Sequence, residues 1–146
     1  MTRIALLGAG RIGQVHARAV SSVPTAKLVA VADPVTKNAK LVQDQYDCDI
    51  RTIDQILLSD DVDGVVICTP TDTHADLIEK FAKAGKAIFC EKPVDLDISR
   101  VQACLTVVQD ENATLMVGFN RRYDPDFQSL KASIDAGQIG EVEMVT

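Results

Sequence analysis

The chain has 146 residues, of which 47% are apolar and 25% are charged. This composition is typical of a globular domain with a sizeable core and excludes intrinsic disorder. The net charge of −6 and the sequence pI near 4.8 give no positive field for phosphate backbones or anionic lipid, so we expect neither nucleic acid nor a membrane as a partner.

The cysteines carry no metal-binding pattern. Cys48, Cys68, Cys90 and Cys104 are spread along the chain without a CxxC pair or a histidine spacing suited to zinc. We therefore expect no metal, and buried apolar roles for these side chains in a reducing compartment. No apolar run approaches the ~20 residues that span a bilayer, and Arg11 interrupts the N-terminal apolar stretch before a signal-like segment forms. The expected location is the cytoplasm.

Short β-branched runs alternate with helical patterns along the chain, which predicts parallel strands joined by helices. The predicted strands are residues 3–7, 27–32, a weak 48–50, 64–68, 87–90 and 114–118. Apolar residues between them recur at helical spacing and give each helix one stripe to pack on a sheet. The strand runs are almost continuously apolar, as expected when helices cover both faces. The predicted fold class is α/β, a Rossmann doubly wound parallel sheet of about six strands.

The turn after the first predicted strand reads GAGRIG, so Gly8, Gly10 and Gly13 form a G-x-G-x-x-G pattern. Gly8 permits a tight turn, Gly10 lets the backbone approach a pyrophosphate, and Gly13 lets helix and strand pack closely. The free N–H groups at the helix start, around Arg11 and Ile12, would hold the phosphates. Taken alone, the pattern also fits a glycine-rich turn that binds nothing.

Asp33 ends the second predicted strand, where its carboxylate could accept hydrogen bonds from the adenosine ribose hydroxyls. The same charge would repel a 2′-phosphate, and no arginine follows in DPVTKNAK. An aspartate before Pro34 is also ordinary turn chemistry. Because glycines, strand, helix and acid occur together, the sequence predicts a dinucleotide site, with NAD favoured over NADP.

Ligands of open parallel sheets lie outside the carboxyl ends of the strands, so the segments after the fourth, fifth and sixth strands are candidate sites. The fourth strand is followed by Thr69 and Thr71, whose hydroxyls and amides could face the cofactor. Asp72 or Thr73 is expected to cap the helix that follows.

Two histidines lie near these segments. A lone histidine such as His74 is more often a surface or packing residue, although its place beside the cofactor mouth favours contact with the cofactor. His16 lies on the packed face of the first predicted helix and is interpreted as structural.

The segments GAGRIGQVHA, ADP, TPTDTHA, EKP and GFNRRYDP, in this order, resemble the cofactor domain of the glucose-fructose oxidoreductase / inositol dehydrogenase / MocA family. The resemblance spans essentially the whole chain, and EKP followed by GFNRR is quite specific to this family. The wording MVGFNRRYDP is similar to the inositol 2-dehydrogenase branch. The resemblance implies an NAD-dependent oxidoreductase that acts on a secondary alcohol of a polyol or sugar, with inositol favoured. Another sugar dehydrogenase of the family is an alternative.

Lys92 stands at the carboxyl end of the fifth predicted strand, near the expected nicotinamide, and Pro93 ends that strand by withholding an N–H and fixing φ. The resemblance implies that Lys92 is a catalytic residue that hydrogen-bonds the substrate oxygen. A partly desolvated ammonium there could stabilise a developing alkoxide or pass a proton. The alternative is a solvated lysine in a loop.

The resemblance further implies that Arg122 reaches the substrate or the nicotinamide and that Asn120 orients it. The adjacent Arg121 is expected to face solvent. Glu91 could accept a hydrogen bond from Lys92 or from the nicotinamide ribose, or could be a surface acid at a strand end.

The resemblance also implies a further aspartate and histidine from a second, antiparallel α+β domain, which we expect to be absent from this chain. We expect a dinucleotide-binding domain over residues 1–120, and over 121–146 a connecting helix and a first strand. Asp124 is the expected N-cap of that helix, Pro125 its first residue, and Gly137 follows its end. Such a chain would bind NAD with little or no turnover, and its uncovered helix favours a homo-oligomer. A stand-alone NAD-binding or regulatory module is the alternative.

Overall fold

The computed structural model describes residues 1–144, and its centre is a six-stranded parallel sheet with the order β3-β2-β1-β4-β5-β6. The strand order reverses between β1 and β4, because the chain crosses from β3 at one edge of the sheet to β4 beside β1, as in doubly wound dinucleotide-binding folds. The predicted α/β class and strand number are confirmed. The strands are β1 (Thr2–Leu7), β2 (Ala26–Ala32), β3 (Asp49–Ile50), β4 (Gly64–Ile67), β5 (Ala87–Cys90) and β6 (Leu115–Val117).

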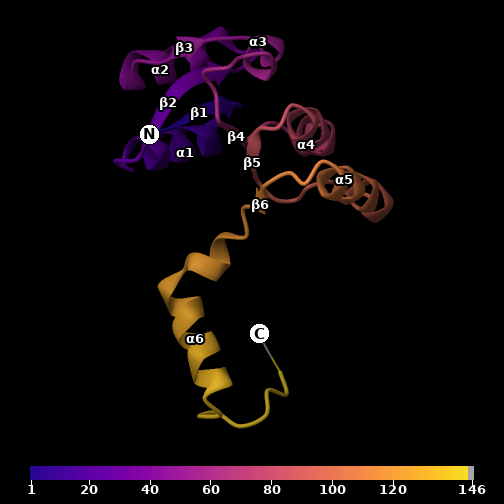
Figure 1. Cartoon of the computed structure of the whole chain (residues 1–146). Coiled ribbons are helices and arrows are strands. Elements are labelled where there is room, and N and C mark those ends of the chain that lie inside the picture. The colour runs from indigo at the N-terminus through magenta and orange to yellow at the C-terminus, as the bar shows by residue number, and fades with distance from the viewer. Residues whose placement is uncertain (145–146) are drawn as a thin grey trace.

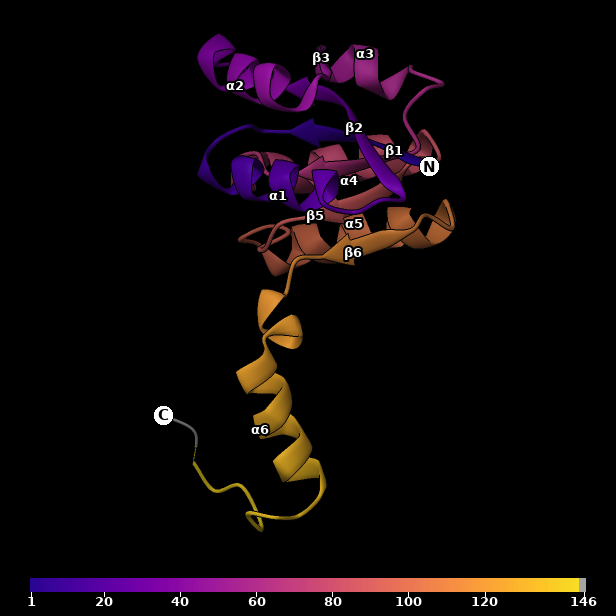
Figure 2. The ribbon, with the colours of Figure 1, turned by 90° about the vertical axis from the view of Figure 1, so that its left-hand side faces the viewer.

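Helices cover both faces of the sheet (Figures 1 and 2). Side chains alternate between faces along a strand, so Leu6 packs with Ala17 of α1 and Val42 of α2, while Ala5 and Leu7 belong to the opposite core. That second core includes buried residues of α3, α4 and α5. The helices are α1 (Arg11–Ser21), α2 (Thr36–Tyr46), α3 (Ile53–Leu57), α4 (His74–Lys83), α5 (Ile98–Asp110) and α6 (Pro125–Asp135).

The strand ends differ from the prediction by at most one residue. Cys68 and Gly118 lie just outside β4 and β6, although each still donates its backbone N–H across the sheet, to Leu7 at 2.7 Å and to Cys90 at 2.8 Å. β4 and β6 therefore end where the chain leaves the sheet towards the segments that the sequence selected as candidate sites.

α6 begins and ends as predicted. Asp124 Oδ1 accepts the N–H groups of Asp126 at 3.0 Å and Phe127 at 3.3 Å, Pro125 is the first residue, and Gly137 follows the helix with φ of +67°. The helix extends away from the sheet (Figures 1 and 2). About half of the Phe127 and Leu130 surfaces is exposed.

The predicted strand at residues 141–146 is not formed over 141–144, where the chain has no regular structure; its last two positions lie outside the described residues. A strand requires a neighbour to pair with, and these four residues pair with none of the six strands. Over residues 1–144, no helix has the length and apolar character needed to cross a membrane.

Candidate functional site

The glycine turn between β1 and α1 is built so that only one of its three glycines borders open space. Gly8 has a φ of +87°, and a Cβ there would lie 2.6 Å from the Cys68 carbonyl oxygen. A Cβ on Gly13 would lie 2.0 Å from the carbonyl oxygen of Gly8. A Cβ on Gly10, by contrast, would meet nothing within 4 Å. Gly8 and Gly13 are therefore required by packing, whereas Gly10 keeps the approach to α1 open.

The start of α1 can hold an anion. Gly10 is the N-cap and provides no side chain, and the helical ladder begins with the Gln14 N–H donating to the Gly10 carbonyl at 2.9 Å. The N–H groups of Arg11, Ile12 and Gly13 precede this first bond and point out of the helix end. The first turn contains no acidic residue. This open cradle fits a pyrophosphate.

Asp33 joins the end of β2 to the glycine turn. Its Oδ2 accepts the Ala9 N–H at 2.6 Å, and its Oδ1 accepts the Val35 N–H at 2.7 Å. The bond from Val35 is the turn interaction expected for an aspartate before Pro34. The bond from Ala9 connects the carboxylate to the glycine turn. A pocket of about 810 Å³ extends from Asp33 to Thr69. Each carboxylate oxygen keeps a further lone pair for a ribose hydroxyl.

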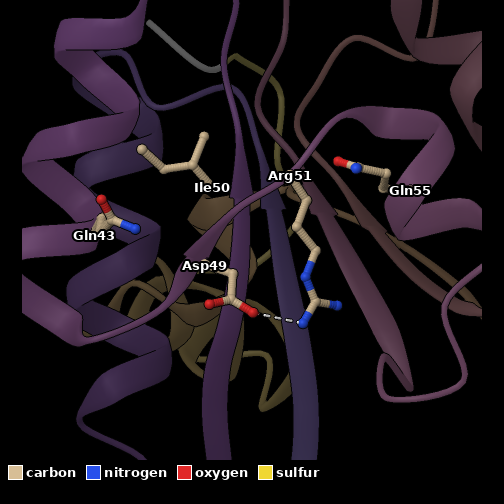
Figure 3. Close-up of a pocket in the computed structure, with 5 residues that line it drawn as sticks. All are labelled: Gln43, Asp49, Ile50, Arg51 and Gln55. Atoms are coloured by element: carbon tan, nitrogen blue, oxygen red, sulfur yellow. Dashed lines mark hydrogen bonds and ion pairs between the residues drawn. The ribbon is translucent and has the colours of Figure 1, made fainter.

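Arg51 also lines that pocket, but its guanidinium is occupied. Its Nη2 donates to Asp49 Oδ2 at 2.8 Å, as Figure 3 shows, and its Nη1 donates to Asp61 Oδ1 at 2.7 Å. The hydrogen bonds that Arg51 donates to Asp61 and Asp49 raise its pKa above the usual value. Arg51 is thus already paired and poorly placed to neutralise a 2′-phosphate, which supports NAD over NADP.

The hollow in Figure 3 adjoins the Asp33 pocket, with which it shares Ile50, Arg51 and Gln55. It has a volume of about 610 Å³ and contains none of the residues that the sequence selected; it is lined by Gln43, Asp49, Ile50, Arg51 and Gln55.

His74 is buried, with 2% of its surface exposed. Its Nδ1 lies 2.8 Å from the carbonyl oxygen of Pro93, and its Nε2 lies 2.8 Å from that of Thr69. Both ring nitrogens are taken by the protein itself, which supports the packing interpretation. No ring nitrogen is left for a hydrogen bond to a ligand, and the cofactor contact expected for His74 stays a prediction.

The cap predicted for α4 is not made. The Thr73 hydroxyl turns back to the Pro70 carbonyl and to Thr69 Oγ1, both at 2.7 Å, and neither Asp72 nor Thr73 binds an N–H of the helix. The reason is a 3₁₀ turn over Thr71–Thr73 that runs directly into α4, so the residue before the helix already has near-helical angles. Thr69 and Thr71 remain at the end of β4, beside the Asp33 pocket.

A second pocket, of about 640 Å³, brings together the catalytic and substrate-binding residues expected from the sequence. It is lined by Lys92, Phe119, Asn120, Arg121 and Arg122. β5 ends at Cys90, two residues before Lys92, and the Lys92–Pro93 peptide is cis. The ammonium thus belongs to the segment after the strand, at the sheet edge where the glycine turn also lies.

Arg121, expected to face solvent, does so with 68% of its side chain exposed. It nevertheless borders the Lys92 pocket, where its Nη1 donates to Asp124 Oδ2 at 3.2 Å and its guanidinium lies 4.9 Å from the centre of the Phe127 ring.

Glu91 has a partner that the sequence did not reveal. Its Oε1 lies 2.7 Å from Nε2 of His16, and its Oε2 accepts the backbone N–H of Lys92 at 3.3 Å. The expected bond from Lys92 is therefore made by the backbone. His16 does pack against Phe89, with ring centres 5.0 Å apart. The only sequence feature that could have indicated this contact is the position of His16, three residues after Gly13 and on the same face of α1.

The strand order, the glycine cradle and the acid at the end of β2 define a dinucleotide-binding α/β domain. The profile described as "Oxidoreductase family, NAD-binding Rossmann fold" (GFO_IDH_MocA) matches residues 2–119. The chain belongs to this family, whose cofactor is NAD.

Relatives point to the same branch of the family. The chain is 65% identical over 144 residues to an inositol 2-dehydrogenase from Rhizobium meliloti, and 42% identical over 142 residues to a scyllo-inositol 2-dehydrogenase (NAD(+)) from Bacillus subtilis. These matches cover 99% and 95% of this chain, but only 44% and 42% of those proteins. The chain thus spans less than half the length of these relatives.

Solved structures agree with the fold. A myo-inositol dehydrogenase from Corynebacterium glutamicum is 42% identical with a TM-score of 0.88, covering 98% of this chain and 43% of that one. The scyllo-inositol dehydrogenase from Lactobacillus casei, solved with NAD(H) and scyllo-inositol, is 30% identical with a TM-score of 0.91. That match covers 97% of this chain and 43% of that one.

Proposed function

We propose that this chain is the NAD-binding part of a dehydrogenase that oxidises a secondary alcohol of a polyol, with an inositol as the substrate. The observation that carries the proposal is the pocket in which Lys92 and Asn120 meet, at the same edge of the sheet as the Gly10 cradle. The names of the relatives support the inositol assignment.

Each group has a physical role in this proposal. Gly10 and the first N–H groups of α1 hold the pyrophosphate, and Asp33 accepts the adenosine ribose hydroxyls. When bound, NAD supplies the hydride acceptor. Lys92 donates a hydrogen bond to the alcohol oxygen and stabilises the negative charge that grows there as the hydride leaves. Asn120 and Arg122, which line the same pocket, orient the polyol.

We also propose the division expected from the sequence, with a cofactor domain over residues 1–120 and a connecting segment from 121 onward. The direction of α6 away from the sheet supports this division. The half-exposed Phe127 and Leu130 support a homo-oligomer. The four free cysteines are compatible with a reducing cytoplasm.

Cofactor choice is tested by titrating the purified chain with NADH and, separately, with NADPH. The chain has no tryptophan, so the fluorescence of the dihydronicotinamide can be followed without that background. We expect saturable binding of NADH and at least about tenfold weaker binding of NADPH, because Asp33 repels a 2′-phosphate and Arg51 is already paired. Equal affinity for the two cofactors would contradict the role of Asp33.

Substrate class is tested by saturation-transfer NMR of myo-inositol with the NADH-loaded chain. We expect a transfer signal for myo-inositol that is lost in Lys92→Ala and weak for glycerol, which offers fewer hydroxyls. The matched control is Lys40→Ala, an exposed lysine of α2 outside both pockets. An inositol signal unchanged in Lys92→Ala would argue against the pocket at Lys92.

A further inference from the structure

The helix that begins at the glycine turn is connected to the segment that carries Lys92. His16, in the second turn of α1, places Nε2 2.7 Å from Oε1 of Glu91. The other carboxylate oxygen, Oε2, accepts the backbone N–H of Lys92 at 3.3 Å. One carboxylate group therefore contacts both the cofactor helix and the residue proposed to bind the substrate.

The carboxylate is enclosed rather than free at the surface. His16 and Glu91 expose only 22% and 21% of their side chains. An ionised carboxylate can only accept hydrogen bonds, so Nε2 of His16 is the donor. Because the pair is largely shielded from water, its hydrogen bond contributes more than an exposed ion pair would.

The surrounding side chains keep the pair in one arrangement. The Phe89 ring lies 5.0 Å from the His16 ring at an angle of 56° and restricts its rotation. A Cβ on Gly118 would lie 3.3 Å from both Cδ and Oε1 of Glu91 and 3.0 Å from the Phe89 ring. Because Gly118, just after β6, has no side chain, the Glu91 carboxylate has room beside it.

We propose that His16 is a positioning residue for Lys92, acting through Glu91. The helix that holds the pyrophosphate and the segment that presents the ammonium are thereby held in a fixed relation, so that Lys92 faces the pocket shared with Asn120. The use of this geometry in binding rests on the proposed function, whereas the connection itself belongs to the cofactor-free chain.

The first test uses the cofactor-free chain and ¹H–¹⁵N NMR. His16→Phe keeps a ring against Phe89 but removes the donor to Glu91, while His16→Gln keeps an N–H donor at a similar reach. Arg18→Gln, on the same helix, is the matched control. We expect His16→Phe to shift the Lys92 amide resonance well beyond the control, and His16→Gln to shift it less than half as far. A Lys92 resonance that moves no more than in Arg18→Gln would overturn the proposal.

The second test is a double-mutant cycle on NADH affinity. We expect His16→Phe to weaken NADH binding by about three- to tenfold, His16→Gln by less than about twofold, and His16→Phe to have no further effect in a Glu91→Ala background. Equal losses in both backgrounds would show that His16 acts through helix packing alone and would overturn the proposal. A wild-type chain that binds no NADH would instead remove the proposed function, and the resonance test would still decide the connection.

Discussion

His74 in the first turn of α4 and Pro93 after β5 are joined by a 2.8 Å hydrogen bond between Nδ1 and the Pro93 carbonyl oxygen. Its other ring nitrogen contacts the Thr69 carbonyl, so the ring connects the segment after β4, which lines the Asp33 pocket, to the segment that carries Lys92. His74→Ala should therefore leave a cavity and two carbonyls without their partner. We expect a loss of about 2–4 kcal/mol in the free energy of unfolding, measured by urea denaturation.

The matched control is Asp72→Ala, an exposed position two residues earlier, which should change stability by less than about 0.5 kcal/mol. If His74→Ala were as stable as this control, the two carbonyl contacts would have no energetic weight.

The parts of this molecule that sequence predicts are those set by local chemistry. Asp124 and Pro125 fix the start of α6 because a cap and a first-turn proline act within three residues of each other. The glycine turn is equally local. Strand ends were less accurate because they depend on where a neighbouring strand stops, as at Cys68 and Gly118.

Contacts between residues far apart in the sequence could not be predicted from local sequence patterns. His16 and Glu91 are 75 residues apart, and their meeting depends on how α1 lies over β5. The pairing of Arg51 with Asp61 likewise requires β3 and the segment before β4 to be placed first. The burial of His74 and its two carbonyl partners likewise follow only from the arrangement of the segments after β4 and β5.

Substitutions at two glycines of the turn should have different effects, one on folding stability and the other on cofactor binding. Gly13→Ala places a Cβ against the Gly8 carbonyl and should destabilise the protein by more than about 2 kcal/mol. Gly10→Ala meets open space and should cost only about 0.5–1 kcal/mol for the poorer N-cap, yet should weaken NADH binding by at least about tenfold because its methyl group occupies the pyrophosphate approach. Thermal unfolding and NADH titration of both variants check this. Undiminished NADH binding by Gly10→Ala would exclude the cradle as the phosphate site.

The cysteine thiols should be unreactive in the folded protein. Burial raises the pKa of Cys68 and Cys90 to about 12 and that of Cys48 to about 11, and it also raises the pKa of Cys104. Thiolates are therefore scarce at about pH 8. With a chromogenic disulfide reagent we expect little release over minutes from the native chain and all four thiols in urea. Rapid release of one equivalent from the native chain would mean that a cysteine is accessible.

Acid should weaken the fold through Asp63. The side-chain hydrogen bonds from Arg3, reinforced by its backbone N–H at 2.7 Å, lower the pKa of Asp63 to about 2. A carboxyl whose pKa is lower in the folded state stabilises the fold above its unfolded pKa of about 4, and this contribution is lost as the pH falls from about 4 towards 2. Asp63→Asn should therefore lower the urea midpoint at neutral pH and flatten its decline over that acid range. The partner variant Arg3→Gln should flatten only part of this decline, because the backbone N–H of residue 3 still donates to Asp63, and adding Asp63→Asn to it should flatten the remainder. A decline of wild-type steepness in Asp63→Asn would assign the acid sensitivity to other carboxylates, such as Asp61, whose pKa is lowered by its hydrogen bond from Arg51.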